Sequence, residues 1–189
     1  MGSPATDPAG SGPREWPQDI LDKAAQVELL VLDVDGVMTN GEVFFSAGGD
    51  ELKAFNILDG QGIKILQRHG VQVAIITGRT SPLTARRADD LGIKHLQQGR
   101  EDKLVALQEL CSMLGISLAQ VAYVGDDVPD LSAIRAVGLG ITVPNAYWLV
   151  HEHACCCTRA AGGEGAVREV ADLLMAAQGK LDGLSQSYL

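Results

Sequence analysis

Short apolar runs that end at acidic, hydroxyl or glycine residues recur along this chain, and they constrain its fold more than any other feature. The segments 27–33 (VELLVLD), 71–77 (VQVAIIT) and 121–125 (VAYVG) are short and rich in Val, Leu and Ile. Such runs are typical of strands that are buried on both faces of a parallel sheet. Segments with helical patterning lie between them, such as 81–91 and 100–114. This alternation predicts an α/β fold, a three-layer α/β/α sandwich around a parallel sheet.

One interruption and two polar ends define the expected organisation of the chain. Two strand-like segments flank a glycine turn at residues 46–50 (SAGGD), which predicts a small β-hairpin insertion over 41–56. No insertion is long enough to form a large cap domain over the sheet. We expect a flexible leader over 1–16, a single domain over 17–177 and a polar tail over 178–189.

The charge balance excludes two classes of partner. With 15 Lys and Arg residues against 24 Asp and Glu residues, the net charge is −9. A protein that binds nucleic acid or anionic lipid as its main task would carry a basic face. No apolar run approaches the roughly 18–20 residues that span a bilayer. We therefore expect no nucleic-acid and no membrane partner, and a small anionic substrate would need a local cluster of Lys and Arg.

The four cysteines, Cys111 and the run Cys155–Cys157, indicate a reducing compartment. Their spacing is not that of a disulfide framework, and the N-terminus has no pattern of a secretory signal. We expect free thiols in the cytoplasm. His151, His153, Cys155 and Cys157 alternate, which would allow a soft-metal site on one strand. Alternating positions on a single strand lie too far apart for tetrahedral binding, so we interpret this segment as a small buried strand beside two surface histidines.

Polar residues directly follow the predicted strands, at the edge of the sheet where α/β proteins bind ligands. A single acid at such a position is usually a helix cap or a turn residue. That explanation does not account for acids on two neighbouring strand ends with a hydroxyl group and a lysine on two others. The set comprises Asp33, Asp35, Thr77, Lys103, Asp126, Asp127 and Asp130.

The converging carboxylates predict a divalent cation. Their charges would repel one another away from water, and a hard cation such as Mg²⁺ binds oxygen ligands. We expect Asp33 and Asp126 to give one oxygen atom each. Asp35 lies two residues after Asp33, which suits attack by one acid and proton exchange by the other. Asp130 is expected to support the loop.

The remaining groups suit a tetrahedral anion. The Thr77 hydroxyl group, the backbone N–H groups of Gly78 and Arg79 and the Lys103 ammonium group could together hold phosphoryl oxygens. The residues therefore predict a site that holds a tetrahedral anion, such as a phosphoryl group, beside the acids.

These motifs resemble those of the haloacid dehalogenase (HAD) superfamily of phosphohydrolases. The likeness rests on DVDGV over 33–37, Thr77, Lys103 and GDD over 125–127, and it extends over about residues 27–145. Further stretches are similar to the 3-deoxy-D-manno-octulosonate 8-phosphate phosphatases of that superfamily. They are 33–41 (DVDGVMTNG), 55–64 (FNILDGQGIK), 77–79 (TGR) and 162–169 (GGEGAVRE).

The resemblance implies an enzyme that releases the sugar acid Kdo for lipopolysaccharide biosynthesis. Asp33 would form an aspartyl-phosphate, and Asp35 would exchange protons with the leaving sugar oxygen and with the attacking water. The main-chain oxygen of Asp35 would join Asp33 and Asp126 as an Mg²⁺ ligand. Asp127 would orient Lys103 or a metal-bound water, so the catalytic set would be Asp33, Asp35, Thr77, Lys103 and Asp127.

The resemblance and the local basic cluster also imply substrate contacts and an assembly. The expected contacts are Asp35, Asn56, Asp59, Gly60, Lys64, Gly78, Arg79, Arg87, Lys103 and Arg168. The family implies a homotetramer in which the hairpin over 41–56 builds a central barrel and helps to close the neighbour's site. The segment 162–168 would reach toward an adjoining active site.

Three alternatives stay open. The substrate could be a related nine-carbon ulosonic (sialic or KDN-type) acid 9-phosphate, or the chain could be a scaffold with a vestigial site. A phosphorelay receiver domain, a signalling module, also gathers acids, Thr and Lys around Mg²⁺. A receiver has its paired acids on the first strand and its phosphoacceptor on a later one, followed by Thr and then Lys near its end. Here Asp33 and Asp35 have Asp-x-Asp spacing on the first strand, and a second acid pair follows Lys103.

Overall fold

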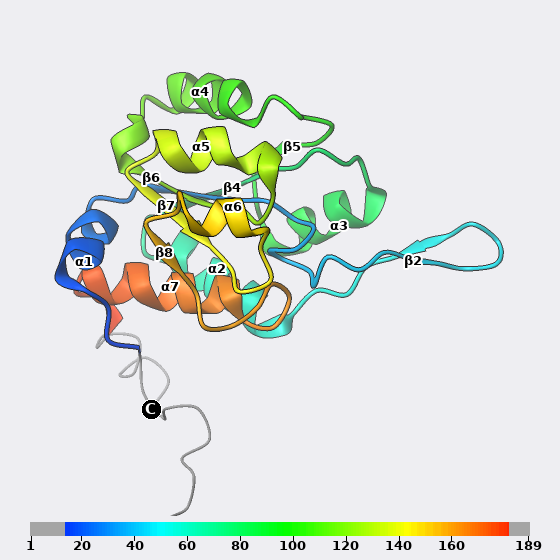
Figure 1. Cartoon of the computed structure of the whole chain (residues 1–189), viewed down its shortest axis with the longest axis horizontal. Coiled ribbons are helices and arrows are strands. Elements are labelled where there is room, and N and C mark those ends of the chain that lie inside the picture. The colour runs from blue at the N-terminus through cyan, green and yellow to red at the C-terminus, as the bar shows by residue number, and fades with distance from the viewer. Residues whose placement is uncertain (1–13, 182–189) are drawn as a thin grey trace, which may run out of the picture.

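A six-stranded parallel sheet forms the centre of the protein, as the computed structural model shows for the residues that it describes, 14–181 (Figure 1). The strand order is β5-β4-β1-β6-β7-β8, and every neighbouring pair is parallel. The strands are β1 (Leu29–Leu32), β4 (Gln72–Ile76), β5 (His95–Gln97), β6 (Val121–Val124), β7 (Leu139–Thr142) and β8 (Cys156–Cys157). The predicted α/β/α architecture is thereby confirmed.

Helices cover both faces of the sheet (Figure 1). One layer consists of α1 (Gln18–Ala25), α2 (Ile57–Arg68), α3 (Pro82–Leu91) and α7 (Ala166–Ala177). The other consists of α4 (Lys103–Leu114), α5 (Leu131–Ala136) and α6 (Trp148–His151), with the 3-10 turns η1 (Leu118–Gln120) and η2 (Val128–Asp130). Each helix in residues 14–181 is too short or too polar to cross a membrane.

Strand β1 shows how the sequence sets up these layers. All four of its residues are buried, and they alternate between the two cores. Leu30 and Leu32 pack in the α2–α7 core, whereas Leu29 and Val31 pack in the α4–α5 core. This period of two is the reason that a continuous apolar run suits a strand covered on both sides.

The register of β1 brings the functional strand ends together. Leu32 pairs with Ile75 of β4 on one side and with Val124 of β6 on the other. The three strands therefore end side by side, and the residues that follow them meet at one edge of the sheet.

Local signals fix the helix ends close to their expected positions. The Ser81 hydroxyl group accepts a hydrogen bond from the Leu83 N–H group at the start of α3, and Pro82 occupies the first turn. Gly92 ends that helix in the left-handed conformation, with φ 69°. Helix α4 begins at Lys103 rather than at Arg100, whose side chain instead pairs with Asp102 and Glu109.

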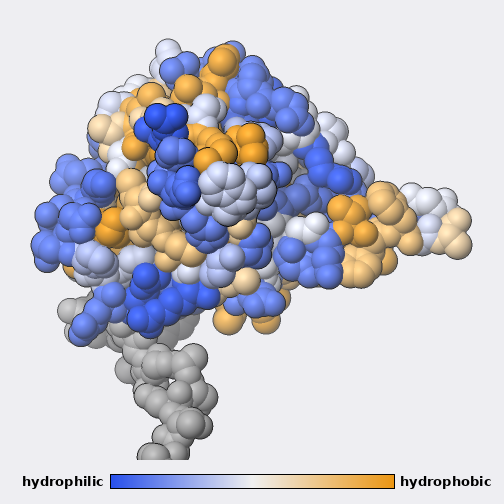
Figure 2. Space-filling view, viewed as in Figure 1, coloured by the Kyte–Doolittle hydropathy of each residue, from blue (hydrophilic) through white to orange (hydrophobic). Residues whose placement is uncertain are grey.

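The predicted hairpin consists of β2 (Phe44–Phe45) and β3 (Glu51–Leu52), which pair antiparallel and extend away from the body (Figure 1). Its strands are shorter than the sequence suggested. Phe44, Phe45 and Leu52 are 51%, 68% and 60% exposed. Apolar surface accordingly runs along the hairpin where it leaves the body (Figure 2).

Part of the predicted leader and tail packs against the domain. Trp16 lies in the α2–α7 core, and the Arg14 side chain pairs with Glu169 of α7 and donates to the Cys157 carbonyl oxygen. Gln178 donates to the Val27 carbonyl oxygen. Residues 1–13 and 182–189, which make up most of the expected leader and tail, lie outside the described residues.

Candidate active site

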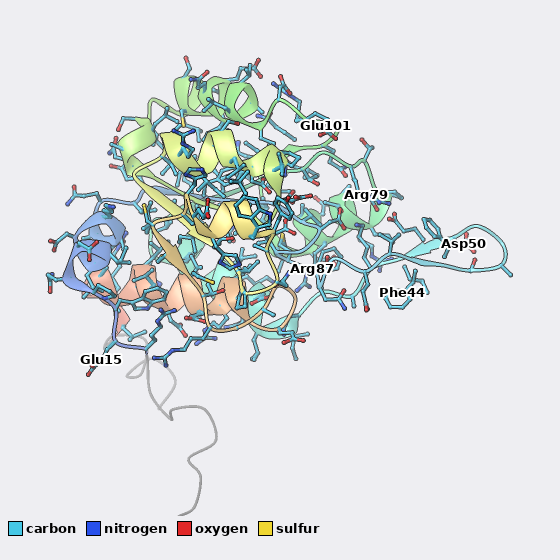
Figure 3. All side chains as sticks on the ribbon, in the orientation of Figure 1. Glu15, Phe44, Asp50, Arg79, Arg87 and Glu101 are labelled. Carbon is cyan, nitrogen blue, oxygen red and sulfur yellow. The ribbon has the colours of Figure 1, made fainter. Side chains whose placement is uncertain are left out.

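A pocket of about 280 Å³ lies at the carboxyl edge of the sheet, where the polar strand ends meet. It is lined by Asp33, Asp35, Gly41, Thr77, Gly78, Arg79, Glu101, Lys103, Asp126, Asp127, Pro129 and Asp130. The structure thus brings together the predicted catalytic and metal residues. Figure 3 shows Arg79 and Glu101 on the side of the body from which the hairpin extends.

Asp33 directly follows β1, and its side chain is buried. It is 6% exposed, and its N–H group donates to the Val124 carbonyl oxygen, which holds it in line with the strand. Burial, followed by the charge of Asp130, raises its pKa to about 7 even though Lys103 lies near. The Lys103 Nζ atom is 3.1 Å from Asp33 Oδ1, but the geometry gives that oxygen no hydrogen bond within the described residues. Asp33 therefore keeps an oxygen available for a further ligand.

Asp126 lies close to Asp33, and its carboxyl group is likewise surrounded by other acidic side chains. Burial and the charges of Asp33 and Asp130 raise its pKa to about 7. One oxygen from each of Asp33, Asp126 and Asp130 lies within 4.8 Å of the others. Gly36 permits this approach, because a Cβ atom there would lie 2.0 Å from Asp126 Oδ2, and its φ of 91° favours glycine. Such a group of hard oxygen donors fits a divalent cation, whose charge would relieve the repulsion.

Asp130 uses its oxygens within the protein. Its Oδ1 atom accepts hydrogen bonds from Lys103 Nζ at 2.7 Å and from the Tyr123 hydroxyl group at 2.8 Å. Its Oδ2 atom accepts from the N–H groups of Asp126 and Asp127 at 3.2 and 3.3 Å. Asp130 is fully buried, so this network fixes Lys103 and the loop after β6 and leaves Asp33 and Asp126 as the better cation ligands.

Lys103 is held by Asp130 rather than by Asp127. Burial alone would lower the pKa of Lys103, but the charges of Asp33 and Asp130 outweigh it and raise the pKa. Lys103 is therefore a firmly charged group beside Asp33. The Asp127 carboxylate accepts from the Val128 N–H group at 2.8 Å and caps the turn η2.

Residues 77–79 (TGR), which follow β4, also line the pocket. Thr77 is 2% exposed, and its N–H group donates to the Gln97 carbonyl oxygen of β5 at 3.0 Å. A Cβ atom at residue 78 would lie 2.7 Å from Glu101 Oε1, so glycine lets the loop pass close to that side chain. Arg79 is half exposed at the rim, with its Nε atom 3.8 Å from Asp35 Oδ2.

The foot of the hairpin contributes two residues that the sequence did not reveal. Lys53 forms an ion pair with Asp35, and Glu51 accepts from Arg79 Nη2 at 2.9 Å. Tyr123 and Glu101 were also missed. No local motif marks these residues, because each acts on a partner that the tertiary fold brings near. Only the position of Lys53 and Glu51 at the end of a hairpin that follows Asp35 closely in sequence could have suggested them.

Four of the predicted substrate contacts line the pocket, namely Asp35, Gly78, Arg79 and Lys103. The other six form a separate group on α2, α3 and α7, outside that lining: Asn56, Asp59, Gly60, Lys64, Arg87 and Arg168. Asn56 caps α2 and donates to the Gly163 carbonyl oxygen, and Arg87 donates to the Asn56 carbonyl oxygen at 3.0 Å. Gly60 leaves room for Arg87, since a Cβ atom there would lie 2.5 Å from Arg87 Nη2. Lys64 lies on the same helix. Their contacts with substrate stay predictions.

Asp59 and Arg168 join α2 to α7 in this group. The Arg168 N–H group donates to Asp59 Oδ1 at 2.8 Å, and the Arg168 side chain pairs with Asp172. Burial raises the pKa of Asp59 to about 6, although backbone N–H groups at the start of α7 oppose the shift. Within the described chain, Asp59 therefore ties α7 to α2.

The glycine-rich segment before α7 packs on the loop after β1, which contains residues 33–37 (DVDGV). The Gly162 N–H group donates to Asn145 Oδ1 at 2.7 Å, and Asn145 Nδ2 donates to the Gly36 carbonyl oxygen at 2.9 Å. A Cβ atom at residue 162 would lie 1.8 Å from that carbonyl oxygen, so the contact requires glycine. This segment thus supports the catalytic loop of its own chain.

The cysteine and histidine segment forms no comparable cluster. Within residues 14–181, only the acids Asp33, Asp126 and Asp130 bring three potential metal ligands together. All four cysteines are free, and Cys155 Sγ lies 3.5 Å from Lys23 Nζ. The strand β8 lies at the edge of the sheet, and Cys156 and Cys157 are half-buried rather than fully buried as expected, although Cys156 packs partly against the α2–α7 core.

Comparison with known proteins gives a consistent result. Residues 43–138 match the haloacid dehalogenase-like hydrolases. The chain is 49% identical over 164 residues to the 3-deoxy-D-manno-octulosonate 8-phosphate phosphatase of Escherichia coli (strain K12), covering 87% of each chain. A probable YrbI-family phosphatase from Pseudomonas syringae superposes with a TM-score of 0.90 and 52% identity, covering 91% of this chain and 98% of that one.

A second solved structure is informative about ligands. It is the 3-deoxy-D-manno-octulosonate 8-phosphate phosphatase of Moraxella catarrhalis in complex with a magnesium ion, a phosphate ion and a KDO molecule. It superposes with a TM-score of 0.90 and 43% identity, covering 91% of this chain and 99% of that one. The acid cluster of the present chain is consistent with a divalent metal of this kind.

Proposed function

The chain belongs to the haloacid dehalogenase-like hydrolases, and we propose that it hydrolyses 3-deoxy-D-manno-octulosonate 8-phosphate to Kdo and inorganic phosphate. The observation that carries this proposal is the juxtaposition of Asp33, Asp126 and Lys103 in one pocket of a chain 49% identical to such an enzyme. The Kdo that is released would serve lipopolysaccharide biosynthesis.

The first step transfers the phosphoryl group to Asp33. A carboxylate oxygen of Asp33 attacks phosphorus, and the bond between phosphorus and the sugar oxygen breaks. Asp35 gives its proton to the leaving sugar oxygen. Thr77 and Lys103 hold the transferred group, and the ammonium group of Lys103, 3.1 Å from Asp33, balances its negative charge.

The second step releases phosphate. Asp35, now ionised, takes a proton from a water molecule that attacks the phosphorus of the aspartyl-phosphate. The bond between phosphorus and Asp33 breaks, which restores the Asp33 carboxylate. Asp130 keeps Lys103 in place throughout, because the 2.7 Å hydrogen bond between them is buried.

The carboxylates of Asp33 and Asp126, with the main-chain oxygen of Asp35, would hold the divalent cation, which we propose is Mg²⁺. A hard oxygen donor set suits this ion, and the Moraxella catarrhalis enzyme was solved with it. When bound, the ion offsets the repulsion between the Asp33 carboxylate and the phosphate dianion.

We also propose a homotetramer located in the cytoplasm. The exposed apolar hairpin supports the assembly, because a surface formed by Phe44, Phe45 and Leu52 is suited to burial against neighbouring chains. In such an assembly the hairpin would help to close the neighbour's site, and the segment 162–168 would reach toward an adjoining site. The four free cysteines fit a reducing compartment.

Phosphate release across a panel of sugar phosphates tests the proposed function. We expect Mg²⁺-dependent turnover of Kdo 8-phosphate, suppression by a chelator, and a loss of roughly 10³-fold or more for Asp33→Asn, since removal of a nucleophile removes the covalent path. Asp90→Asn, an exposed change on α3, serves as the matched control. Preferential turnover of a nine-carbon ulosonic acid 9-phosphate would reassign the substrate, and full activity of Asp33→Asn would refute the role of Asp33.

A further inference from the structure

Four charged side chains form a closed ring at the foot of the hairpin. Lys53 forms an ion pair with Asp35 and lies 3.8 Å from Glu51 Oε1. Glu51 Oε1 lies 2.9 Å from Arg79 Nη2, and Arg79 Nε lies 3.8 Å from Asp35 Oδ2. The ring therefore joins the hairpin and the loop after β4, which carries Arg79, to Asp35.

Lys53 is the most enclosed member of this ring. Its side chain is only 1% exposed, whereas the side chain of Arg79 is 50% exposed. A buried ammonium group is costly unless it is paired, and truncating one partner of such a pair is strongly destabilising. Lys53 thus has one well-defined position, between Asp35 and Glu51.

Glu51 ties the ring to a rigid element of the body. Its Oε2 atom accepts a hydrogen bond from the Ser81 hydroxyl group at 3.0 Å. Ser81 is the residue that caps α3, so its own position is fixed by the start of that helix. The hairpin foot is therefore anchored on the core.

We infer that Lys53 is a positioning residue for the proposed reaction, which holds the Asp35 carboxyl group where it can exchange a proton with the leaving sugar oxygen. Glu51 and Arg79 hold Lys53 and Asp35 in turn. This inference rests on the proposed function, because the proton transfer that it serves belongs to that reaction. Lys53 itself neither gains nor loses a proton in the step.

Single-turnover kinetics with two substrates separates this role from a merely structural one. Expulsion of a sugar alkoxide needs the Asp35 proton, whereas p-nitrophenol leaves readily without it. For Lys53→Met we expect the rate of alcohol release from Kdo 8-phosphate to fall about 10²-fold, the lower end of the range for general-acid catalysis. Release of p-nitrophenol from p-nitrophenyl phosphate should fall by less than about 3-fold, because that first step makes little use of proton donation.

Three further variants complete the design. Lys53→Arg keeps the charge and should recover part of the loss with Kdo 8-phosphate. In an Asp35→Asn background, Lys53→Met should add less than about 3-fold, because the residue that it positions is already disabled. Lys94→Met, an exposed lysine before β5, is the control for loss of a charge. If Lys53→Met does not fold by circular dichroism, Lys53→Gln carries the same comparison.

The outcomes are distinguishable. Equal losses on both substrates, additive losses with Asp35→Asn, or an unchanged rate with Kdo 8-phosphate would each overturn the inference while leaving the phosphatase intact. A wild-type protein that releases no phosphate from Kdo 8-phosphate would instead contradict the proposed function.

Discussion

Asp130 shows how much of the site depends on a residue that does not react. Its two oxygens accept hydrogen bonds from Lys103, from Tyr123 and from the N–H groups of the loop after β6. Asp130, Lys103 and Tyr123 are themselves buried. Tyr123 adds to this closed network, since burial and the nearby acids raise its pKa well above the usual value and keep its hydroxyl group protonated. The position of Lys103 beside Asp33 is a consequence of this arrangement.

Replacement of Asp130 should therefore destabilise the fold. We expect Asp130→Ala to lower the free energy of unfolding by about 3–5 kcal/mol, because it leaves the buried ammonium group of Lys103 without its principal partner. Urea unfolding followed by circular dichroism measures the change. Asp90→Ala on the exposed face of α3 should stay within about 0.5 kcal/mol of the wild type. A value for Asp130→Ala as small as that of the control would show that the network does not stabilise the protein.

At the residue scale, the sequence predicted the side chains that follow strands and missed those that arrive from elsewhere. Asp33, Thr77 and Asp126 could be placed because the ends of parallel strands meet at one edge. Lys53 and Tyr123 could not, since their partners are set by how the hairpin folds back and by which face of β6 meets Asp130. Asp127 was expected to orient Lys103 or a metal-bound water. The structure pairs Lys103 with Asp130 for the same reason, and the role with a metal-bound water stays a prediction.

The hairpin is an element that has few stabilising contacts within its own chain. A two-stranded hairpin is marginally stable alone, and its paired strands are two residues each. Its foot is anchored through Glu51 and Lys53, but its phenylalanines face solvent. Neighbouring chains that cover these phenylalanines would complete this element.

Assembly should accordingly depend on the exposed apolar side chains of the hairpin strands. We expect the wild type to sediment as a tetramer and the double variant Phe44→Asp/Phe45→Asp to sediment as a smaller species, because charges cannot be buried cheaply in an apolar interface. Analytical ultracentrifugation provides the measurement. Met113→Asp changes an equally exposed apolar residue on α4, 66% exposed, and should leave the assembly intact. A monomeric wild type, or a double variant that stays tetrameric, would contradict this assignment.

Element types were predictable where the pattern was long and regular, and boundaries were not. The apolar run at 121–125 became β6 almost unchanged, since each of its residues faces a core. The candidate strand at 154–158 became only Cys156–Cys157, because an edge strand has one neighbour to pair with. The expected hairpin strands are also shorter in the structure. The strand β3 ends at Leu52, and the side chain of the next residue, Lys53, pairs with Asp35.

Across the whole molecule, the net charge is −9, yet the proposed substrate is an anion. Positively charged side chains gathered near the pocket make its binding possible. Lys103 and Arg79 line the pocket, and Lys53 contacts Asp35 beside it. The acidic residues that line the pocket still outnumber these cations. The raised pKa values of Asp33 and Asp126, both about 7, express that imbalance. Without a cation, the folded state holds these protons more tightly than the unfolded chain, where Asp titrates near 4. Their contribution to stability is therefore lost as the pH rises through about 7.

Magnesium should stabilise the protein more at high pH than at low pH. The ion requires ionised carboxylates, so its binding strengthens as Asp33 and Asp126 lose their protons. At a concentration about 100-fold above its Kd, Mg²⁺ should add about 2.7 kcal/mol of stability. We expect a rise in Tm of several degrees at pH 8, a much smaller rise at pH 5.5, and none for Asp126→Asn. A rise that is equal at both pH values, or that persists in Asp126→Asn, would place the ion elsewhere.

Capture of the covalent intermediate tests the central claim most directly. The enzyme would be quenched in acid during turnover of Kdo 8-phosphate, reduced with borohydride to convert an acyl phosphate into an alcohol, and analysed by peptide mass spectrometry. We predict that the reduced side chain is that of Asp33, and that it is absent without substrate. Reduction at Asp35 or Asp126, or no reduced carboxyl group while phosphate is being released, would contradict nucleophilic attack by Asp33.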